Sequence, residues 1–168
     1  MDRIVSNATP LIYLAKADKL HLLKDIAKQV YIPEAVFHEV VIEGKRLGKK
    51  DAYRVEKCIN QGWLNVKKAQ KNLSFDIPIH YGELEVISLA AQERIIKVLI
   101  DDAKARSIAD LAGLQPVGTL WVILEAVINR LMDFDEFLST LETIIRSGFY
   151  PKDEVYIKVI RKARELYR

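Results

Sequence analysis

The sequence has little of the chemistry that builds disulfide frameworks or zinc sites. Cys58 is the only cysteine among the 168 residues, which excludes an internal disulfide and a cysteine-rich zinc site. The histidines, His21, His38 and His80, are too scattered to form a recognisable zinc-binding spacing. We therefore expect them to be surface or packing residues, and we assign none of them a catalytic role.

Long apolar runs are also missing. The longest runs, such as the one over residues 122–124, are far shorter than the roughly 20 residues that a helix needs to cross a bilayer. The first ten residues, MDRIVSNATP, have no extended apolar region after Arg3 and do not resemble a signal peptide. We expect no membrane span and a cytoplasmic location.

The composition favours a compact α/β protein. Hydrophobic residues make up 50% of the chain, and no repeat, low-complexity tract or linker divides it, so we expect a single domain over residues 1–168. Apolar stripes predict a C-terminal helical extension, about 134–168, that packs on this domain or supports a homodimer. The net charge of +3 and the pI near 8.9 permit a nucleic-acid partner without requiring one.

Two adjacent acids end a predicted buried strand in the second half of the chain. Three branched apolar residues at 98–100 are followed by Asp101 and Asp102, which cannot share the burial of that strand. A helix over residues 103–111 and a short strand over residues 115–117 then predict a parallel α/β sheet. Because ligands in such sheets bind beyond the carboxyl ends of the strands, we expect the active site at the two acids.

Two further polar residues lie in the first quarter of the chain. Asn7 follows a predicted strand over residues 3–6, and Thr9 and Pro10 predict the cap and first residue of a helix. Glu39 lies on an apolar flank of a later predicted helix, where a carboxylate needs a partner. We expect both Asn7 and Glu39 near the sheet edge.

Glu83 is the third candidate acid. It begins a predicted helix over residues 81–92 on the side that faces the sheet, whereas Glu85 lies roughly 160° further round the helix. Between these regions, residues 44–50 are basic and broken by glycine, which predicts a mobile loop, and a second basic stretch surrounds Lys67. Basic runs of this kind are usually solvated surface.

The clustered acids predict either raised pKa values or a bound cation, because neighbouring carboxylates repel one another. We favour a metal ion. Oxygen ligands without cysteine or histidine suit Mg²⁺ or Mn²⁺, which can activate water and stabilise the leaving oxygen of a phosphodiester. The sequence therefore points to nuclease chemistry.

Several motifs in the right order resemble a prokaryotic subgroup of PIN-domain proteins. They cover nearly the whole chain and are SNATPLIYLAK from Ser6, VYIPEAVFHEV from Val30, HYGELEVISLA from His80, LIDDAKAR from Leu99 and AGLQPVGTL from Ala112. The resemblance implies a three-layer α/β/α fold with a four- or five-stranded parallel sheet and C-terminal helices. It also implies a Mg²⁺ or Mn²⁺ site, cleavage of single-stranded RNA, and frequent use as the toxin of a toxin–antitoxin pair.

The resemblance also implies positions for the family's acids. Its first aspartate falls at Asn7, its second acid at Glu39, its third at Glu83, and its later acids at Asp101 or Asp102. Asn7 departs from the pattern, because an amide brings a neutral oxygen where a carboxylate brings a charge, which lowers metal affinity.

A second departure is Trp121, which stands where this subgroup has a small residue. The indole would narrow the mouth of the site or offer a stacking surface.

Our leading hypothesis is a metal-dependent endoribonuclease whose activity Asn7 weakens or abolishes. Glu39, Glu83 and Asp102 hold the metal in this hypothesis, Asp101 or Asn7 completes the ligands, and Lys104, Arg106 and Thr119 contact RNA. Asp102 and Arg106 are also spaced to form an ion pair, which could be a surface contact or could hold the site.

Two alternatives remain open at this stage. The first is a catalytically silent PIN-fold module that binds RNA or a protein such as a small antitoxin. The second, a phosphorelay receiver domain, is disfavoured because its acidic pair follows the first strand, whereas here the pair lies past mid-chain.

Overall fold

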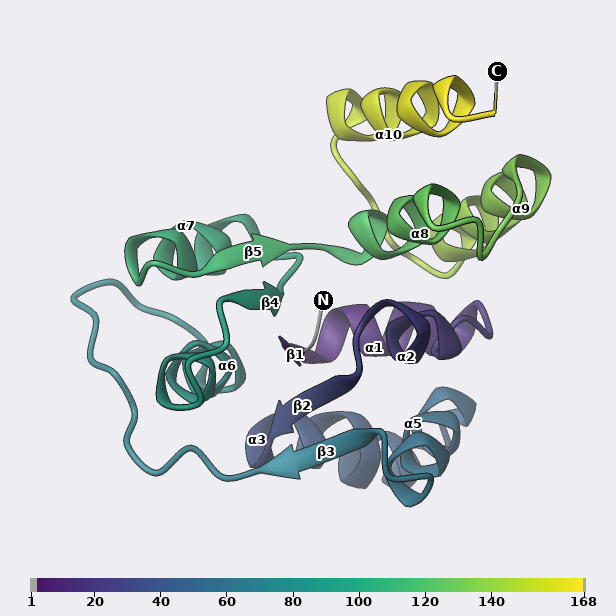
Figure 1. The fold of residues 1–168 in the computed structure, drawn as a ribbon. Coiled ribbons are helices and arrows are strands. Elements are labelled where there is room, and N and C mark those ends of the chain that lie inside the picture. Colours follow the sequence, from purple (N-terminus) through teal and green to yellow (C-terminus); the bar gives the residue numbers. More distant parts are fainter. Residues whose placement is uncertain (1–2, 168) are drawn as a thin grey trace.

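A central parallel sheet organises the chain in the computed structural model, which describes residues 3–167 (Figure 1). The strands run in the order β3-β2-β1-β4-β5. They are β1 Arg3–Ser6, β2 Gln29–Pro33, β3 Leu64–Lys67, β4 Lys97–Leu99 and β5 Gln115–Val117. The expectation of an α/β fold with a four- or five-stranded parallel sheet and C-terminal helices is confirmed, with five strands.

Helices cover both faces of this sheet, with α6 and α7 on one side and α1, α5 and α8 on the other (Figure 1). The first half of the chain contains α1 Ala8–Lys16, α2 His21–Ile26, α3 Glu34–Phe37, the π-helical segment η1 His38–Glu43, α4 Gly44–Arg46 and α5 Lys50–Asn60. The second half contains α6 Tyr81–Gln92, α7 Ala103–Leu111, α8 Thr119–Ile128, α9 Phe134–Arg146 and α10 Asp153–Glu165. None of the helices in residues 3–167 is long and apolar enough to cross a membrane.

The strand order reverses direction between β1 and β4, which lie side by side at the centre of the sheet. The strands that follow β1 in sequence, β2 and β3, extend to one side, and β5 extends to the other side of β4. Val5 of β1 is in register with Tyr31 of β2 and with Val98 of β4, and Val5 and Val98 are fully buried. Parallel sheets bind ligands at such a reversal, beyond the carboxyl ends of the strands.

The first helix and its cap both lie two residues earlier than predicted. Asn7 occupies the N-cap position with extended backbone, so that Thr9 and Pro10 fall in the first turn. Pro10 is tolerated there because the first backbone N–H groups of a helix have no intrahelical partner.

The predicted mobile loop over residues 44–50 is wrong for most of its length. Gly44 begins α4, and a Cβ at this position would lie 2.8 Å from the Ala52 Cβ, so the glycine allows close helix packing and does not break the chain. An ion pair of 2.8 Å between Lys45 and Glu56 joins α4 to α5. The turn is confined to residues 47–49, where Gly48 has a φ of +68°.

Strand β3 was not predicted. Its four residues, LNVK, alternate apolar and polar side chains, but only Leu64 is buried, and the run is too short and too close to the basic stretch around Lys67 to be recognised as a strand. This is the expected appearance of an edge strand, which packs against the sheet along one side only.

The two C-terminal helices differ in how deeply they pack. Phe137 of α9 is fully buried, and Leu141 and Ile144 extend the same buried stripe. In α10 only Val159 and Ala163 are buried. The apolar stripe predicted along this helix is therefore buried only in part, and its last members, Leu166 and Tyr167, are exposed.

Candidate active site

The carboxyl ends of β1 and β4 bring Asn7 close to the acidic pair. Asn7 follows β1 directly, and its backbone N–H donates a hydrogen bond of 2.9 Å to the carbonyl oxygen of Leu99, the last residue of β4. Asp101 and Asp102 come two and three residues after Leu99. The site therefore lies at the reversal of the strand order, where the sequence pattern placed it.

A pocket of about 320 Å³ opens at this position. Its lining comes from the start of α1, from η1 and from the start of α6, and consists of Asn7, Ala8, Thr9, Glu39, His80, Gly82 and Glu83. A Cβ on Gly82 would lie 3.7 Å from the Glu39 Oε2 and 3.9 Å from the Asn7 Oδ1. Both distances are ordinary van der Waals contacts, so the Glu39 and Asn7 oxygens lie against the backbone at the beginning of α6.

Glu83 is the buried acid of this pocket, with 9% of its surface exposed. Burial raises the pKa of its carboxyl group, and the negative charges of Asp102 and Glu39 raise it further. A hydrogen bond from the His80 backbone N–H acts in the opposite direction. Glu83 is the third residue of α6 and His80 is its N-cap, so this bond is one half of a capping box.

The two adjacent aspartates have different surroundings. Asp102 is exposed, and its Oδ1 accepts a hydrogen bond of 2.8 Å from the backbone N–H of Ala105, which makes it the N-cap of α7. Its charge also reaches Glu83. Asp102 can therefore serve the pocket and the helix together.

Asp101 is directed toward the first residue of α8. Its carboxylate accepts hydrogen bonds of 2.8 Å from the Thr119 backbone N–H and 2.6 Å from the Thr119 hydroxyl. Burial raises the pKa of Asp101, whereas these two bonds and the charge of Arg106 lower it. Asp101 thus ties the exit of β4 to the start of α8 and does not line the pocket described above.

The predicted RNA contact of Thr119 is wrong in this structure. Its side chain is fully buried and its hydroxyl is donated to Asp101, so RNA cannot reach it. Within the described residues, Asp102 and Arg106 do not form the ion pair that their spacing allows. Arg106 instead donates a hydrogen bond of 3.2 Å to the carbonyl oxygen of Ile100. Lys104 is exposed on the first turn of α7, where its contact with RNA stays a prediction.

Two residues of this region were missed by reasoning from the sequence. His80 lines the pocket, and its position three residues before Glu83 was the available signal. Glu85 is buried, although its angular position predicted the opposite, and it accepts a hydrogen bond of 2.9 Å from the Ala35 backbone N–H at the start of α3. The packing of α3 on α6 covers this second side of the helix.

The oxygen donors of the pocket fit a hard divalent cation in kind. Asn7, Glu39 and Glu83 offer one amide and two carboxylate groups, and Mg²⁺ is usually held by one or two carboxylates together with water and substrate phosphates. In the described range 3–167, no group of three or more His, Cys, Asp or Glu side chains is placed to hold a metal ion by itself. Asn7 brings the third oxygen donor of the pocket, as a neutral amide.

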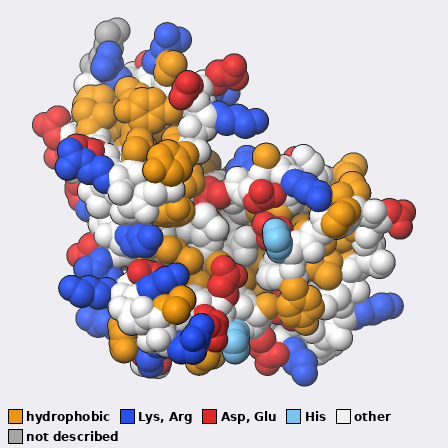
Figure 2. Space-filling view, turned by 180° about the vertical axis from the view of Figure 1, so that it is seen from behind, with side chains coloured by type: hydrophobic (Ala, Val, Ile, Leu, Met, Phe, Trp, Pro, Cys, Tyr) orange, Lys and Arg blue, Asp and Glu red, His pale blue; other side chains and the backbone are white. Residues whose placement is uncertain are grey.

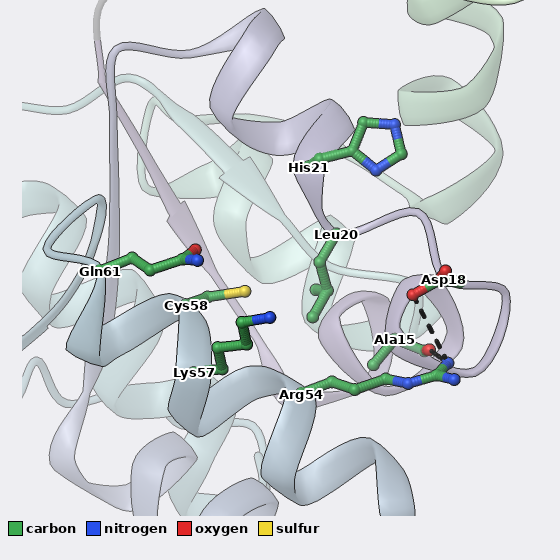
Figure 3. A pocket seen from close by; sticks show the side chains of 8 residues that line it. All are labelled: Ala15, Asp18, Leu20, His21, Arg54, Lys57, Cys58 and Gln61. Carbon is green, nitrogen blue, oxygen red and sulfur yellow. Dashed lines mark hydrogen bonds and ion pairs between the residues drawn. The ribbon is translucent and has the colours of Figure 1, made fainter.

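A second pocket, of about 330 Å³, lies at the other end of α1 and has a different chemistry (Figure 3). Arg54 crosses it and donates to the carbonyl oxygen of Ala15, with Asp18 3.9 Å away. Cys58 points into the same space, but burial raises the pKa of its thiol and keeps it protonated, unlike a nucleophilic cysteine. This pocket has no cluster of acids and does not compete with the first as a catalytic site.

Comparisons with known proteins agree with the fold described above. A family model described as a PIN domain matches residues 3–165. A search of curated proteins finds no match. Among solved structures, the chain is similar to a PilT N-terminus domain protein from the hyperthermophilic archaeon Sulfolobus solfataricus, with a TM-score of 0.50 and 13% identity over 73% of this chain and 90% of that one. At this identity the likeness concerns the fold alone.

Proposed function

Because this chain belongs to the PIN-domain family, we propose that it is a metal-dependent endoribonuclease that hydrolyses phosphodiester bonds in single-stranded RNA. One observation carries the proposal. A buried carboxyl group, Glu83, shares a pocket with Glu39 and the amide of Asn7 at the reversal of the strand order, and the negative charges of Asp102 and Glu39 act on it. Carboxylates kept together without a cation repel one another, so the arrangement favours Mg²⁺ or Mn²⁺.

Each residue has a stated part in this proposal. Glu39, Glu83 and Asp102 would hold the cation, with the Asn7 amide oxygen as a neutral ligand. A divalent cation bound there would supply Lewis-acid activation of water and neutralise charge on the phosphate. Asp102 also orients the start of α7, where the exposed Lys104 is available to an RNA phosphate.

The proposal is tested by cleavage of a fluorophore- and quencher-labelled single-stranded RNA with Mg²⁺ or Mn²⁺, and with EDTA. We expect Asn7→Asp to raise cleavage because it adds a charged ligand, and Asp102→Ala to abolish it. Glu142→Gln, at an exposed acid of α9, is the matched control and should leave cleavage unchanged. Cleavage that responds to none of these site variants would show that another site is responsible.

Asn7 also favours a second candidate, a catalytically silent PIN-fold module that binds RNA or a protein. A neutral amide in place of a carboxylate weakens metal binding, whereas it leaves the basic surface of the chain intact. RNA binding without turnover, even for Asn7→Asp at saturating Mn²⁺, would favour this module over the enzyme.

A toxin role with a small antitoxin partner, and a homodimer, belong to the proposal as expectations. The exposed apolar residue Ile157 of α10, which lines a hollow with Leu124 of α8, is the contact that we expect to support self-association. Light scattering after size exclusion tests the dimer, and growth arrest on expression that depends on Asp102 tests the toxin role.

A further inference from the structure

In addition to the two pockets described above, the structure has a groove that begins at Asp101. Its volume is about 660 Å³, and it lies between α7 and the C-terminal helices. Figure 2 shows a notch between the C-terminal helices and the rest of the molecule on this face. Asp101 and Ala103 line the groove, and Asp102 lies between them in sequence, so the groove begins beside the acidic pair.

One wall of the groove is a segment held firmly against α1. The hydroxyl of Tyr13 donates a hydrogen bond of 3.0 Å to the carbonyl oxygen of Gly148, and the ring of Tyr13 meets Phe149 edge-on at 5.1 Å. The next residue, Tyr150, lines the groove and is 86% exposed. Burial, together with the charges of Asp101 and Tyr150, raises the pKa of Tyr13, which agrees with this close arrangement.

The facing wall carries a second aromatic side chain. Trp121 of α8 lines the groove, and the ammonium group of Lys97 lies 4.6 Å from the centre of the indole, which fixes the ring by a cation–π contact. Lys152 and Arg106 also line the groove, as do the acids Asp101 and Asp110, and the charge of Arg106 acts on Asp101, so that Lys152 is the cation available to a phosphate. Two aromatic rings accompanied by a cation are the combination that binds single-stranded nucleic acid, because bases stack on the rings and phosphates contact the cation.

We propose that this groove binds an unpaired nucleobase of the RNA next to the cleavage site, with Tyr150 and Trp121 as stacking surfaces and Lys152 as a phosphate contact. The inference rests on the proposed function, because its ligand is the substrate of that reaction. It assigns selection of the nucleotide beside the cut to the C-terminal part of the chain.

The test measures binding of a short fluorescein-labelled single-stranded RNA by anisotropy in EDTA, so that binding is separated from cleavage. We expect Tyr150→Ala to weaken affinity about tenfold, and Tyr150→Phe to bind like the wild type, because stacking needs the ring and not the hydroxyl. Leu111→Ala is the matched control, since Leu111 is a 78% exposed apolar residue of α7 that does not line the groove. It should leave affinity unchanged.

A series of RNAs with one abasic position each identifies the base concerned. Wild-type protein should lose affinity at one position, and Tyr150→Ala should show no further loss at that position. Equal affinity of Tyr150→Ala and Leu111→Ala would overturn the proposal and point to a protein as the occupant. RNA that is bound with this abasic pattern but never cut would contradict the nuclease and leave the groove assignment standing. If both variants cut RNA with equal KM, the nuclease proposal would stand and the groove assignment would be contradicted.

Discussion

Replacing Thr119 by valine tests the assignment of Asp101 to structure and not to metal binding. The substitution keeps the shape of the side chain and removes one hydroxyl, whose 2.6 Å hydrogen bond to the Asp101 carboxylate is buried. A hydrogen bond to a charged group contributes about 1.5–3 kcal/mol. We therefore expect the free energy of unfolding to fall by about this amount, and the melting temperature to fall by about 3–12 °C for a chain of this size.

The loss should depend on pH. Burial raises the pKa of Asp101 above its ordinary value, so the folded state holds a proton that the unfolded state releases, and stability falls as pH rises through that interval. Without the hydroxyl, the charged carboxylate has one donor fewer and its pKa rises further. The difference between Thr119→Val and wild type should accordingly grow from acidic to neutral pH and then become constant.

Urea unfolding followed by circular dichroism provides the measurement, in the wild-type and Asp101→Asn backgrounds. A double-mutant cycle should give a coupling of about 1 kcal/mol or more between the two positions. Thr143→Val is the control, because this exposed hydroxyl bonds only to the Ser139 carbonyl of its own helix, and it should change stability by less than about 0.5 kcal/mol. Equal losses for Thr119→Val in both backgrounds would refute the assignment.

Three further substitutions test other parts of the structure. Glu83→Gln should raise the melting temperature at neutral pH. Burial raises the pKa of the Glu83 carboxyl, so the folded protein loses stability as pH rises above the ordinary glutamate range, and glutamine removes that loss. A lower melting temperature would contradict this reasoning. Gly44→Ala should destabilise by about 1–3 kcal/mol in thermal unfolding, because its Cβ would lie 2.8 Å from the Ala52 Cβ, and an unchanged midpoint would show that α4 can move aside. Glu85→Ala should cost about 1 kcal/mol, since the half-buried Ala35 N–H loses its acceptor, and Glu85→Gln should recover most of the loss in the same urea titration.

Much of the fold could be predicted from the sequence because the central strands have strong local signals. The strands β1, β4 and β5 and the helix α6 lie where alternation, apolar runs and glycine stops placed them. The segments that were wrong or missed depend on tertiary contacts. Gly44 resembles a helix breaker until Ala52 is seen against it, and β3 needs the side of β2 to be recognised as a strand.

The sequence predicted which residues lie at the candidate site better than it predicted the contacts of each one. Asn7, Glu39 and Glu83 line one pocket, as expected from elements that end or begin at the same sheet edge. The sequence separated Asp102, as a metal ligand, from Asp101, as a less certain one, but the contacts of each could not be derived, because adjacent residues after a strand diverge according to the next backbone donors available. Here the donors come from Ala105 in one case and Thr119 in the other, which are far apart in sequence.

The π-helical segment η1 changes the direction in which successive side chains point, so that Glu39 and Gly44 can face different parts of the structure. Glu39, near its start, must face the pocket, whereas Gly44, just past its end, must face Ala52 of α5. In an uninterrupted α-helix each residue advances about 100°, so the direction of one of these residues would dictate the direction of the other. The wider i→i+5 winding of η1 breaks that dependence. The number of residues in this segment is therefore constrained independently of their identity. Deleting one residue would turn either Glu39 away from the pocket or Gly44 away from Ala52.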